Sequence, residues 1–155
     1  MTKLLRAVRL DDSDDELFRA CGAAKDGEPV VTGGYAVCDF AGKRACDPSC
    51  HCESSFLALA SKARCTLAEV VEASEEELEA QTDALAWHLV RAWGAPSWEA
   101  ARRLAEEELR HTAEVCETLA PEAWIAVRRE PAAGGGAVEE QYSVYDRLMV
   151  GAHPL

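Results

Sequence analysis

The feature that most constrains the fold is a pair of helical segments separated by a short break, between residues 74 and 116. The first segment opens on Ser74-Glu75-Glu76-Glu77, a capping box in which the serine hydroxyl and the Glu77 carboxylate satisfy backbone N–H groups at the helix start. Gly94-Ala95-Pro96 ends this helix, and Ser97 is placed to cap the next one. The sequence therefore predicts a helical hairpin.

Each predicted helix carries one apolar face at helical spacing. The two stripes are Leu78, Leu85, Ala86, Leu89 and Trp93 in the first helix, and Trp98, Ala105, Leu109, Thr112 and Cys116 in the second. Trp87 falls on the opposite side of the first helix, where solvent is expected. Because tryptophan is favoured in the cores of interfaces, Trp87 either covers a second packed layer or marks a surface for a protein partner or a homodimer.

Segments rich in β-branched and aromatic residues flank the hairpin on both sides and predict strands. They cover residues 3–10, 28–40, 64–73, 124–130 and 139–147, and the stretch 54–63 fits a helix or a strand equally. Gly33 and Gly34 indicate a bend or bulge in the second strand, and the glycines of 131–136 indicate a turn between the last two. This order predicts an α+β fold, an antiparallel sheet with the helical hairpin packed on one face, in a single domain of residues 1–155.

The acidic run Asp11-Asp12-Ser13-Asp14-Asp15 predicts a solvated turn, since short polar side chains bond their own backbone. A calcium loop would need a central glycine and a glutamate at the twelfth position, and both are lacking.

Charge and hydropathy exclude two classes of partner. With 28 acidic and 16 basic residues the chain carries a net charge of −12, which repels nucleic acids and anionic membranes. Its apolar runs are shorter than the roughly 20 residues of a membrane helix, and its first residues do not form a secretion signal. We therefore expect a cytoplasmic protein. In that reducing compartment its seven cysteines are interpreted as packed thiols, metal ligands or reactive groups before disulfides.

Three cysteines within seven residues form the main candidate site. Cys46, Cys50 and Cys52 lie in the stretch CDPSCHC, and Cys38 lies eight positions upstream. Thiolates gathered by a tight turn hold zinc, at about 2.3 Å, or an iron–sulfur cluster. The predicted ligands are Cys38, Cys46, Cys50 and Cys52, with Cys65 or His51 as alternatives to Cys38. The spacing matches no standard metal motif, so two further hypotheses stay open: redox-active thiols, or ordinary thiols without a special role.

The remaining candidates predict no chemistry. Cys21 and Cys65 stand alone and are interpreted as structural, and Cys116 as a core residue. Glu107, Glu108 and His111 form a single Glu-x-x-His-type arrangement, whereas di-iron bundles use two, so an exposed Glu–His pair is expected. The chain contains no nucleophile elbow, phosphate-binding loop or dinucleotide fingerprint. We therefore predict no catalytic residues.

Four stretches carry a resemblance to a known family: KLLRAVRLDDSD, TLAEVVEAS, LAWHLVRAWGAPSWEAARRLAEEEL and WIAVRRE. Over most of its length the chain resembles a bacterial family of small proteins known by a domain-of-unknown-function label. The resemblance implies a cytosolic accessory protein, because members are often encoded near molybdenum-dependent formate dehydrogenases and their maturation factors. The chain departs from the family pattern at Cys46–Cys52, where a cysteine-poor segment is expected.

The leading hypothesis is a non-catalytic accessory or assembly protein for a metal-dependent oxidoreductase of the formate dehydrogenase type. It would bind zinc or an iron–sulfur centre through the loop cysteines and contact a protein partner, an oxidoreductase subunit or maturation factor, or a second copy of itself. The alternatives are a small thiol-dependent redox enzyme using Cys46, Cys50 or Cys52, and a metal-free structural subunit or homodimer.

Overall fold

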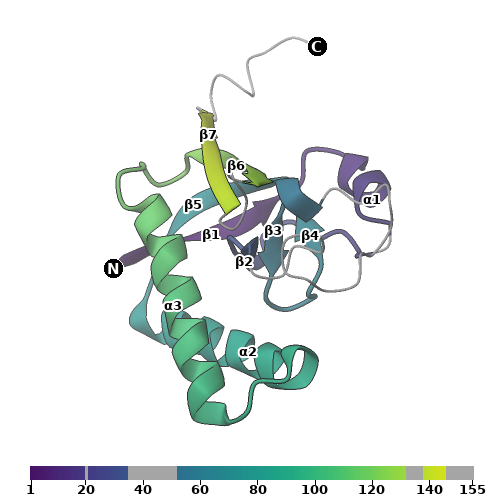
Figure 1. Cartoon of the computed structure of the whole chain (residues 1–155). Coiled ribbons are helices and arrows are strands. Elements are labelled where there is room, and N and C mark those ends of the chain that lie inside the picture. Colours follow the sequence, from purple (N-terminus) through teal and green to yellow (C-terminus); the bar gives the residue numbers. More distant parts are fainter. Residues whose placement is uncertain (20, 35–51, 132–137, 146–155) are drawn as a thin grey trace.

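The computed structural model of the protein describes residues 1–19, 21–34, 52–131 and 138–145. Within these residues seven strands form one antiparallel sheet, and two long helices pack together beside it (Figure 1). The α+β fold predicted from the sequence is confirmed. The strands are β1 (Thr2–Val8), β2 (Pro29–Val31), β3 (Phe56–Ala58), β4 (Arg64–Cys65), β5 (Leu67–Ala73), β6 (Trp124–Pro131) and β7 (Val138–Tyr145), in the spatial order β4-β3-β2-β1-β5-β6-β7.

The central strand β1 is covered on both faces. It pairs along its full length with β5, from Thr2 opposite Ala73 to Val8 opposite Leu67, and its other edge pairs with β2. Successive side chains of a strand point to opposite faces, and both Leu4 and Leu5 are buried. Leu4 belongs to a cluster shared with the helices, and Leu5 to a second cluster on the other face.

The helices α2 (Glu75–Trp93) and α3 (Trp98–Cys116) form the predicted hairpin, packed on one face of the sheet. The predicted capping box is present, with Ser74 and Glu77 bonding each other's backbone N–H groups. Gly94 ends α2 in the left-handed conformation at φ 67°, which glycine adopts without steric cost. The apolar cluster under the hairpin consists of Leu4, Val31, Leu57, Leu59 and Ala73 from the sheet side with Leu85, Ala86, Leu89, Ala101, Ala105 and Leu109 from the helices.

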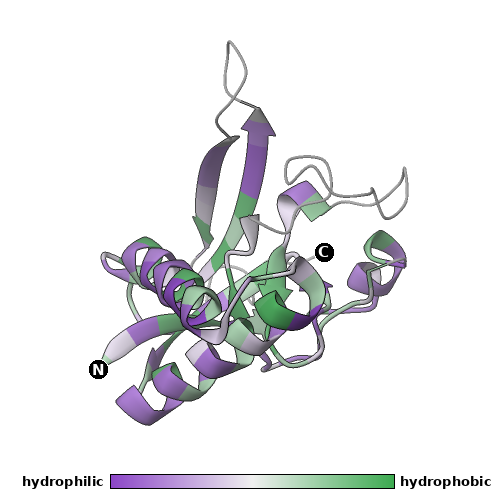
Figure 2. Ribbon diagram, turned by 60° about the horizontal axis from the view of Figure 1, so that its bottom comes forward, coloured by the Kyte–Doolittle hydropathy of each residue, from purple (hydrophilic) through white to green (hydrophobic). Residues whose placement is uncertain are grey.

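The other face of the sheet encloses the second cluster because the sheet curls. Phe56 of β3 and Ile125 of β6 both belong to this cluster, although three strands separate β3 from β6. Cys116, at the end of α3, also packs there. Figure 2 shows hydrophobic ribbon in the central strands, both kinds of residue alternating along the helices, and hydrophilic ribbon toward the tip of the β6–β7 hairpin. The curl brings the residues that follow β2 and precede β3 close to β6 and β7, and this closeness forms the site described below.

Three local predictions differ from the structure. The acidic run expected to be a solvated turn contains a short helix, α1 (Ser13–Leu17), and Asp14 is buried because it accepts hydrogen bonds from Thr66. Thr66 also interrupts the strand predicted over 64–73, which divides into β4 and β5. Trp98, expected on the buried stripe of α3, is exposed.

Two ambiguous or partial predictions are settled for the described residues. The stretch 54–63 contains strand β3, and of the strand predicted over 28–40 the structure describes β2, while residues 35–40 lie outside the described part of the chain. Across the described ranges a membrane-crossing helix is lacking, since α2 and α3 are long enough but carry many charged residues.

Candidate functional site

A buried polar cluster begins where β2 ends, at Thr32-Gly33-Gly34. The Thr32 hydroxyl donates to Oε1 of Glu108 at 2.6 Å, and the Gly33 backbone N–H donates to the same oxygen at 3.0 Å. The Thr32 N–H donates to the Thr112 hydroxyl at 3.2 Å. Glu108 and Thr112 lie one turn apart on α3, so the helix binds both the backbone and the side chain of this segment. These bonds satisfy the backbone N–H groups of Thr32 and Gly33.

Arg129 of β6 holds the same segment from the opposite side. Its guanidinium is fully buried and donates to the Thr32 carbonyl at 2.5 Å and to the Ser55 carbonyl at 2.8 Å. Its Nε donates to Oε2 of Glu140 on β7 at 2.7 Å. A buried cation is tolerated only when it is paired and its donors are satisfied. Arg129 meets both conditions and joins β6 to Thr32, which follows β2, and to Ser55, which precedes β3.

Glu140 collects three hydrogen bonds. Besides Arg129, the Tyr142 hydroxyl donates to its Oε1 at 2.7 Å, and Nε2 of His111 lies 2.8 Å from the same oxygen. Burial opposes ionisation of Glu140, but the hydrogen bonds from His111, Arg129 and Tyr142 outweigh it and lower its pKa to about 2. The contact with Glu140 raises the pKa of His111 in turn, against a smaller opposing effect of burial. Glu140 therefore stays ionised at neutral pH.

Two glycines let the backbone approach its neighbours closely in this segment. A Cβ at Gly34 would lie 2.7 Å from Oε2 of Glu140, and one at Gly33 would lie 2.6 Å from Cβ of Leu57. Gly33 also has φ 73°, which residues with a side chain rarely adopt. The two glycines thus lie just after β2, where the backbone passes Leu57 and the carboxylate of Glu140.

We call this set the polar brace: Thr32, Glu108, His111, Thr112, Arg129, Glu140 and Tyr142. Its charged groups pair with one another and with backbone N–H and C=O groups, so the arrangement is typical of a structural network. The predicted Glu–His pair does not form as such, because Glu108 binds β2's end whereas His111 binds β7. Sequence reasoning missed Arg129 and Glu140 as brace residues, since their alternation in strands looks like ordinary solvent-facing charge.

A pair of thiols lies beside the brace. Cys52 begins the 3-10 turn η2 (Cys52–Ser54) and is only 3% exposed. Its Sγ lies 3.3 Å from Sγ of Cys21, a half-buried residue 31 positions earlier in the chain. The two sulfurs are in contact but are not joined in a disulfide, whose S–S bond is about 2.05 Å long. Two sulfur ligands of one tetrahedral zinc, each about 2.3 Å from the metal, lie about 3.8 Å apart. We call Cys21 and Cys52 the thiol pair.

Backbone hydrogen bonds hold the thiol pair in place. The Cys52 carbonyl accepts from the Ser55 N–H at 3.2 Å and from the Ser55 hydroxyl at 2.8 Å. After Cys21, the Gly22 N–H donates to the Phe18 carbonyl at 2.6 Å, and the Gly22 carbonyl accepts from the Arg64 N–H at 2.9 Å. The guanidinium of buried Arg64 donates to the Ser55 hydroxyl at 3.2 Å.

The predicted metal ligands divide between the described and undescribed parts of the chain. Cys38, Cys46 and Cys50, and the alternative His51, lie outside the described residues, whereas Cys52 lies in η2. The other alternative, Cys65, is packed in the apolar cluster, where burial raises the pKa of its thiol. Among the described residues no group of three or more His, Cys, Asp or Glu side chains is placed to hold a metal.

Cys21 differs most from its interpretation as an isolated structural residue. Only one cysteine occurs in that stretch, so spacing gives no signal that it meets another thiol. Cys116, in contrast, lies in the core as predicted, and burial raises its pKa to about 12.

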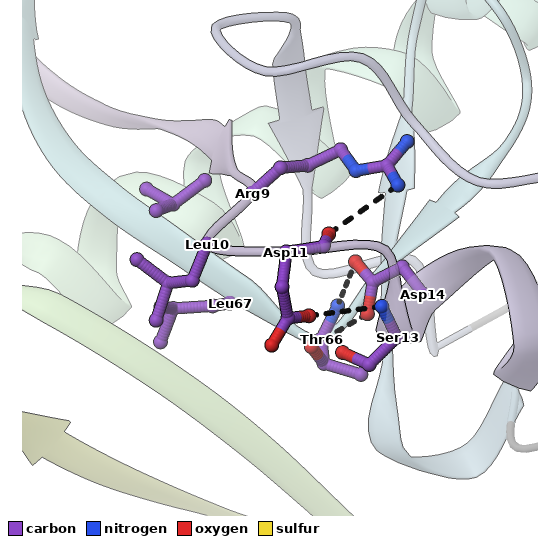
Figure 3. A pocket seen from close by; sticks show the side chains of 8 residues that line it. Arg9, Leu10, Asp11, Ser13, Asp14, Thr66 and Leu67 are labelled. Carbon is purple, nitrogen blue, oxygen red and sulfur yellow. Dashed lines mark hydrogen bonds between the residues drawn. The ribbon is translucent and has the colours of Figure 1, made fainter. Parts of the chain in front are cut away.

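A hollow of about 90 Å³ lies beside α1, and its lining mixes apolar side chains with Arg9, Asp11 and Asp14 (Figure 3). Asp11 accepts from the Ser13 N–H at 2.9 Å, and Asp14 accepts from the Thr66 hydroxyl at 2.9 Å. The Arg9 guanidinium pairs with Asp15 at 2.8 Å. These carboxylates hold α1 and the residues before it against β1 and β5.

Comparison with known proteins places the chain in a family. No curated protein and no solved structure matches it significantly. A family profile matches residues 1–150, which is nearly the whole chain, and includes the brace and the thiol pair. The protein therefore belongs to DUF6505, a family of unknown function.

Proposed function

We propose that this protein is a non-catalytic accessory protein that holds zinc or an iron–sulfur centre through cysteine thiolates, with Cys21 and Cys52 as two of the ligands. The observation that carries the proposal is the 3.3 Å contact between their sulfurs. Two thiols brought together from distant parts of a chain provide half of a tetrahedral thiolate site. A shift of about half an ångström would bring them to the spacing of zinc ligands.

The chemistry around the pair supports metal binding. A thiol must lose its proton to become a ligand, and two such groups already lie in contact here. Cys46 and Cys50 precede Cys52 by six and two positions and are proposed as the remaining ligands, with Cys38 as a further candidate. Cys65 is a poor ligand in this proposal, because its apolar surroundings disfavour the thiolate.

The accessory role includes a partner, a metal-dependent oxidoreductase of the formate dehydrogenase type. The family resemblance suggested from the sequence is the ground for this choice. An exposed aromatic patch on the helices supports protein contact: Trp87 is 49% exposed, its ring lies 4.8 Å from that of Trp98, and the Arg91 guanidinium lies 5.1 Å above it. Large exposed aromatic side chains are favoured at interfaces.

Metal content tests the first part of the proposal. Protein purified without air is expected to carry about one equivalent of zinc per chain, or to be brown from an iron–sulfur cluster. Cys52→Ser and Cys21→Ser should each lower the bound metal strongly. Cys116→Ala, which alters a thiol of the apolar core, should retain it. Wild-type protein that carries only traces of zinc and iron contradicts the proposal.

Partner binding is tested separately. Metal-loaded protein is mixed with a molybdenum-dependent formate dehydrogenase, and the mass of the complex is measured by light scattering. Trp87→Ala should weaken the complex, while Leu104→Ala, another exposed apolar residue of the hairpin, serves as its control. A protein that elutes as a dimer of itself and ignores the enzyme would favour the structural homodimer instead.

A further inference from the structure

We propose that Cys21 and Cys52 form a reversible disulfide, and that its closure empties the proposed metal site. Release of the metal on oxidation rests on the proposed function, whereas formation of the disulfide requires only the contact between the two thiols. The two sulfurs lie 3.3 Å apart and must approach by about 1.3 Å to bond. Rotation of the side chains covers such a distance, and both cysteines lie outside the strands of the sheet.

Burial assigns different roles to the two sulfurs. Cys21 is half-buried and accessible to a small oxidant, whereas Cys52 is 3% exposed. Susceptibility to oxidation follows thiolate character and exposure. Cys21 is therefore the attacking thiol and Cys52 the resolving one. The other described cysteines, Cys65 and Cys116, are fully buried in the apolar cluster, where burial raises their pKa and keeps them as thiols.

The oxidant is a small peroxide, and the reaction balances in two steps. The Cys21 thiolate attacks one peroxide oxygen, the O–O bond breaks, and the departing hydroxide takes a proton to leave as water, giving a sulfenic acid. The Cys52 sulfur then attacks the Cys21 sulfur, the S–O bond breaks, and the hydroxyl leaves as a second water with the Cys52 proton. The two sulfurs together lose two electrons, and hydrogen peroxide is reduced to two waters. A dithiol reductant reverses the change.

Closure removes two ligands at once. A sulfur engaged in a disulfide carries no thiolate charge, so the proposed site loses Cys21 and Cys52 as ligands. Affinity for a soft metal depends on the number of thiolates. Peroxide should therefore release the metal, and a reductant should restore binding.

The disulfide is tested on reduced, metal-free, full-length protein treated with one equivalent of hydrogen peroxide. Trypsin places Cys21 in the peptide 20–25 and Cys52 in the peptide 45–62. Mass spectrometry without reduction should find these two peptides linked, with loss of two hydrogen atoms. Fragment ions should assign the bond to Cys52 instead of Cys46 or Cys50. Absence of the link, or a link from Cys21 to another cysteine, overturns the inference and leaves the metal proposal standing.

The order of attack is tested with two variants. In Cys52→Ser, peroxide should leave a sulfenic acid on Cys21, which dimedone traps. The dimedone label on Cys21 in this variant should be several-fold higher than the label on Cys52 in Cys21→Ser. Equal labelling of the two variants contradicts the assigned roles. Circular dichroism of both variants shows whether each still folds.

Metal control is tested on the loaded protein. Peroxide should release zinc to a chromogenic chelator in step with formation of the Cys21–Cys52 link, and Cys116→Ala should behave as wild type. Metal that stays bound while the link forms overturns the control. Protein that binds no metal in either redox state defeats the proposed function and its control together, even where the disulfide forms.

Discussion

The polar brace and the thiol pair lie next to each other but differ in how their groups are satisfied. In the brace, Arg129 has three acceptors and Glu140 has three donors. In the thiol pair, two sulfurs, which are weak hydrogen-bond donors and acceptors, lie in contact at 3.3 Å. The two regions meet at Ser55, whose carbonyl accepts from Arg129 and whose hydroxyl donates to the Cys52 carbonyl.

The difference separates structural chemistry from reactive chemistry. A buried charge whose partners are all present has no unsatisfied group to offer a ligand. Removal of one partner leaves a buried charge uncompensated, which destabilises the fold. A thiol contact can change by oxidation to a disulfide or by binding of a metal. We expect brace substitutions to reduce the free energy of unfolding, and substitutions in the thiol pair to change chemistry while stability is nearly preserved.

The largest expected effect is that of Arg129→Met. The substitution leaves Glu140 without its buried cation and leaves two carbonyls unbonded, so the free energy of unfolding should fall by about 3–5 kcal/mol. Denaturant unfolding measures this loss. Arg128→Met is the matched control, because the neighbouring Arg128 is 71% exposed and pairs with Glu130 at the surface, where the expected cost is below about 1 kcal/mol. Equal losses in the two variants would mean that the brace is not a stabilising network.

Glu108→Ala should have an intermediate effect. It removes the carboxylate that accepts from the Thr32 hydroxyl and the Gly33 N–H, and hydrogen bonds to a charged group contribute about 1.5–3 kcal/mol. Glu107→Ala, one residue earlier on the exposed side of α3, should cost less than about 0.5 kcal/mol. Hydrogen exchange at the Gly33 amide should speed up in the first variant alone. An unchanged Gly33 amide would show that Glu108 does not hold this segment.

The local elements of the fold were predictable from the sequence because their causes are local. Ser74, Glu77 and Gly94 act within a few residues of their own positions, and the helical hairpin follows from them. The pairing of β1 with β5 agrees with strand patterns read from each segment separately. The burial of Asp14 was missed because its partner, Thr66, is 52 residues away.

Long-range contacts explain what was missed in the candidate sites. Arg129 reaches Thr32 and Ser55 only because the sheet curls, and no sequence spacing encodes that curl. Cys52 was expected to meet cysteines near it in the chain, a prediction that concerns undescribed residues, and the structure adds Cys21 from 31 positions away. A pairwise contact of this kind depends on the fold of both segments, so a single sequence gives no pattern for it.

The smallest predicted effect concerns pH and the His111–Glu140 contact. The pKa of His111 in the folded protein is raised above its ordinary value of 6.5, chiefly by the hydrogen bond to Glu140, with Glu108 and Glu114 contributing charge. The contact therefore stabilises the protein fully below pH 6.5 and is lost as the pH rises through the folded-state pKa. His111 is 45% exposed, so the gain is expected to be below about 1 kcal/mol.

The measurement is the difference in the free energy of unfolding between wild type and His111→Ala, taken from pH 6 to pH 9. We expect this difference to shrink as the pH rises. His88→Ala is the control with the opposite sign, because burial, together with the charges of Lys62 and Arg64, lowers the pKa of His88 below 6.5. The protonated His88 is disfavoured in the folded protein, so its penalty grows as the pH falls below 6.5. Parallel pH profiles for the two variants would show that His111 does not respond to Glu140, and β7 would then be held to the helices by other contacts.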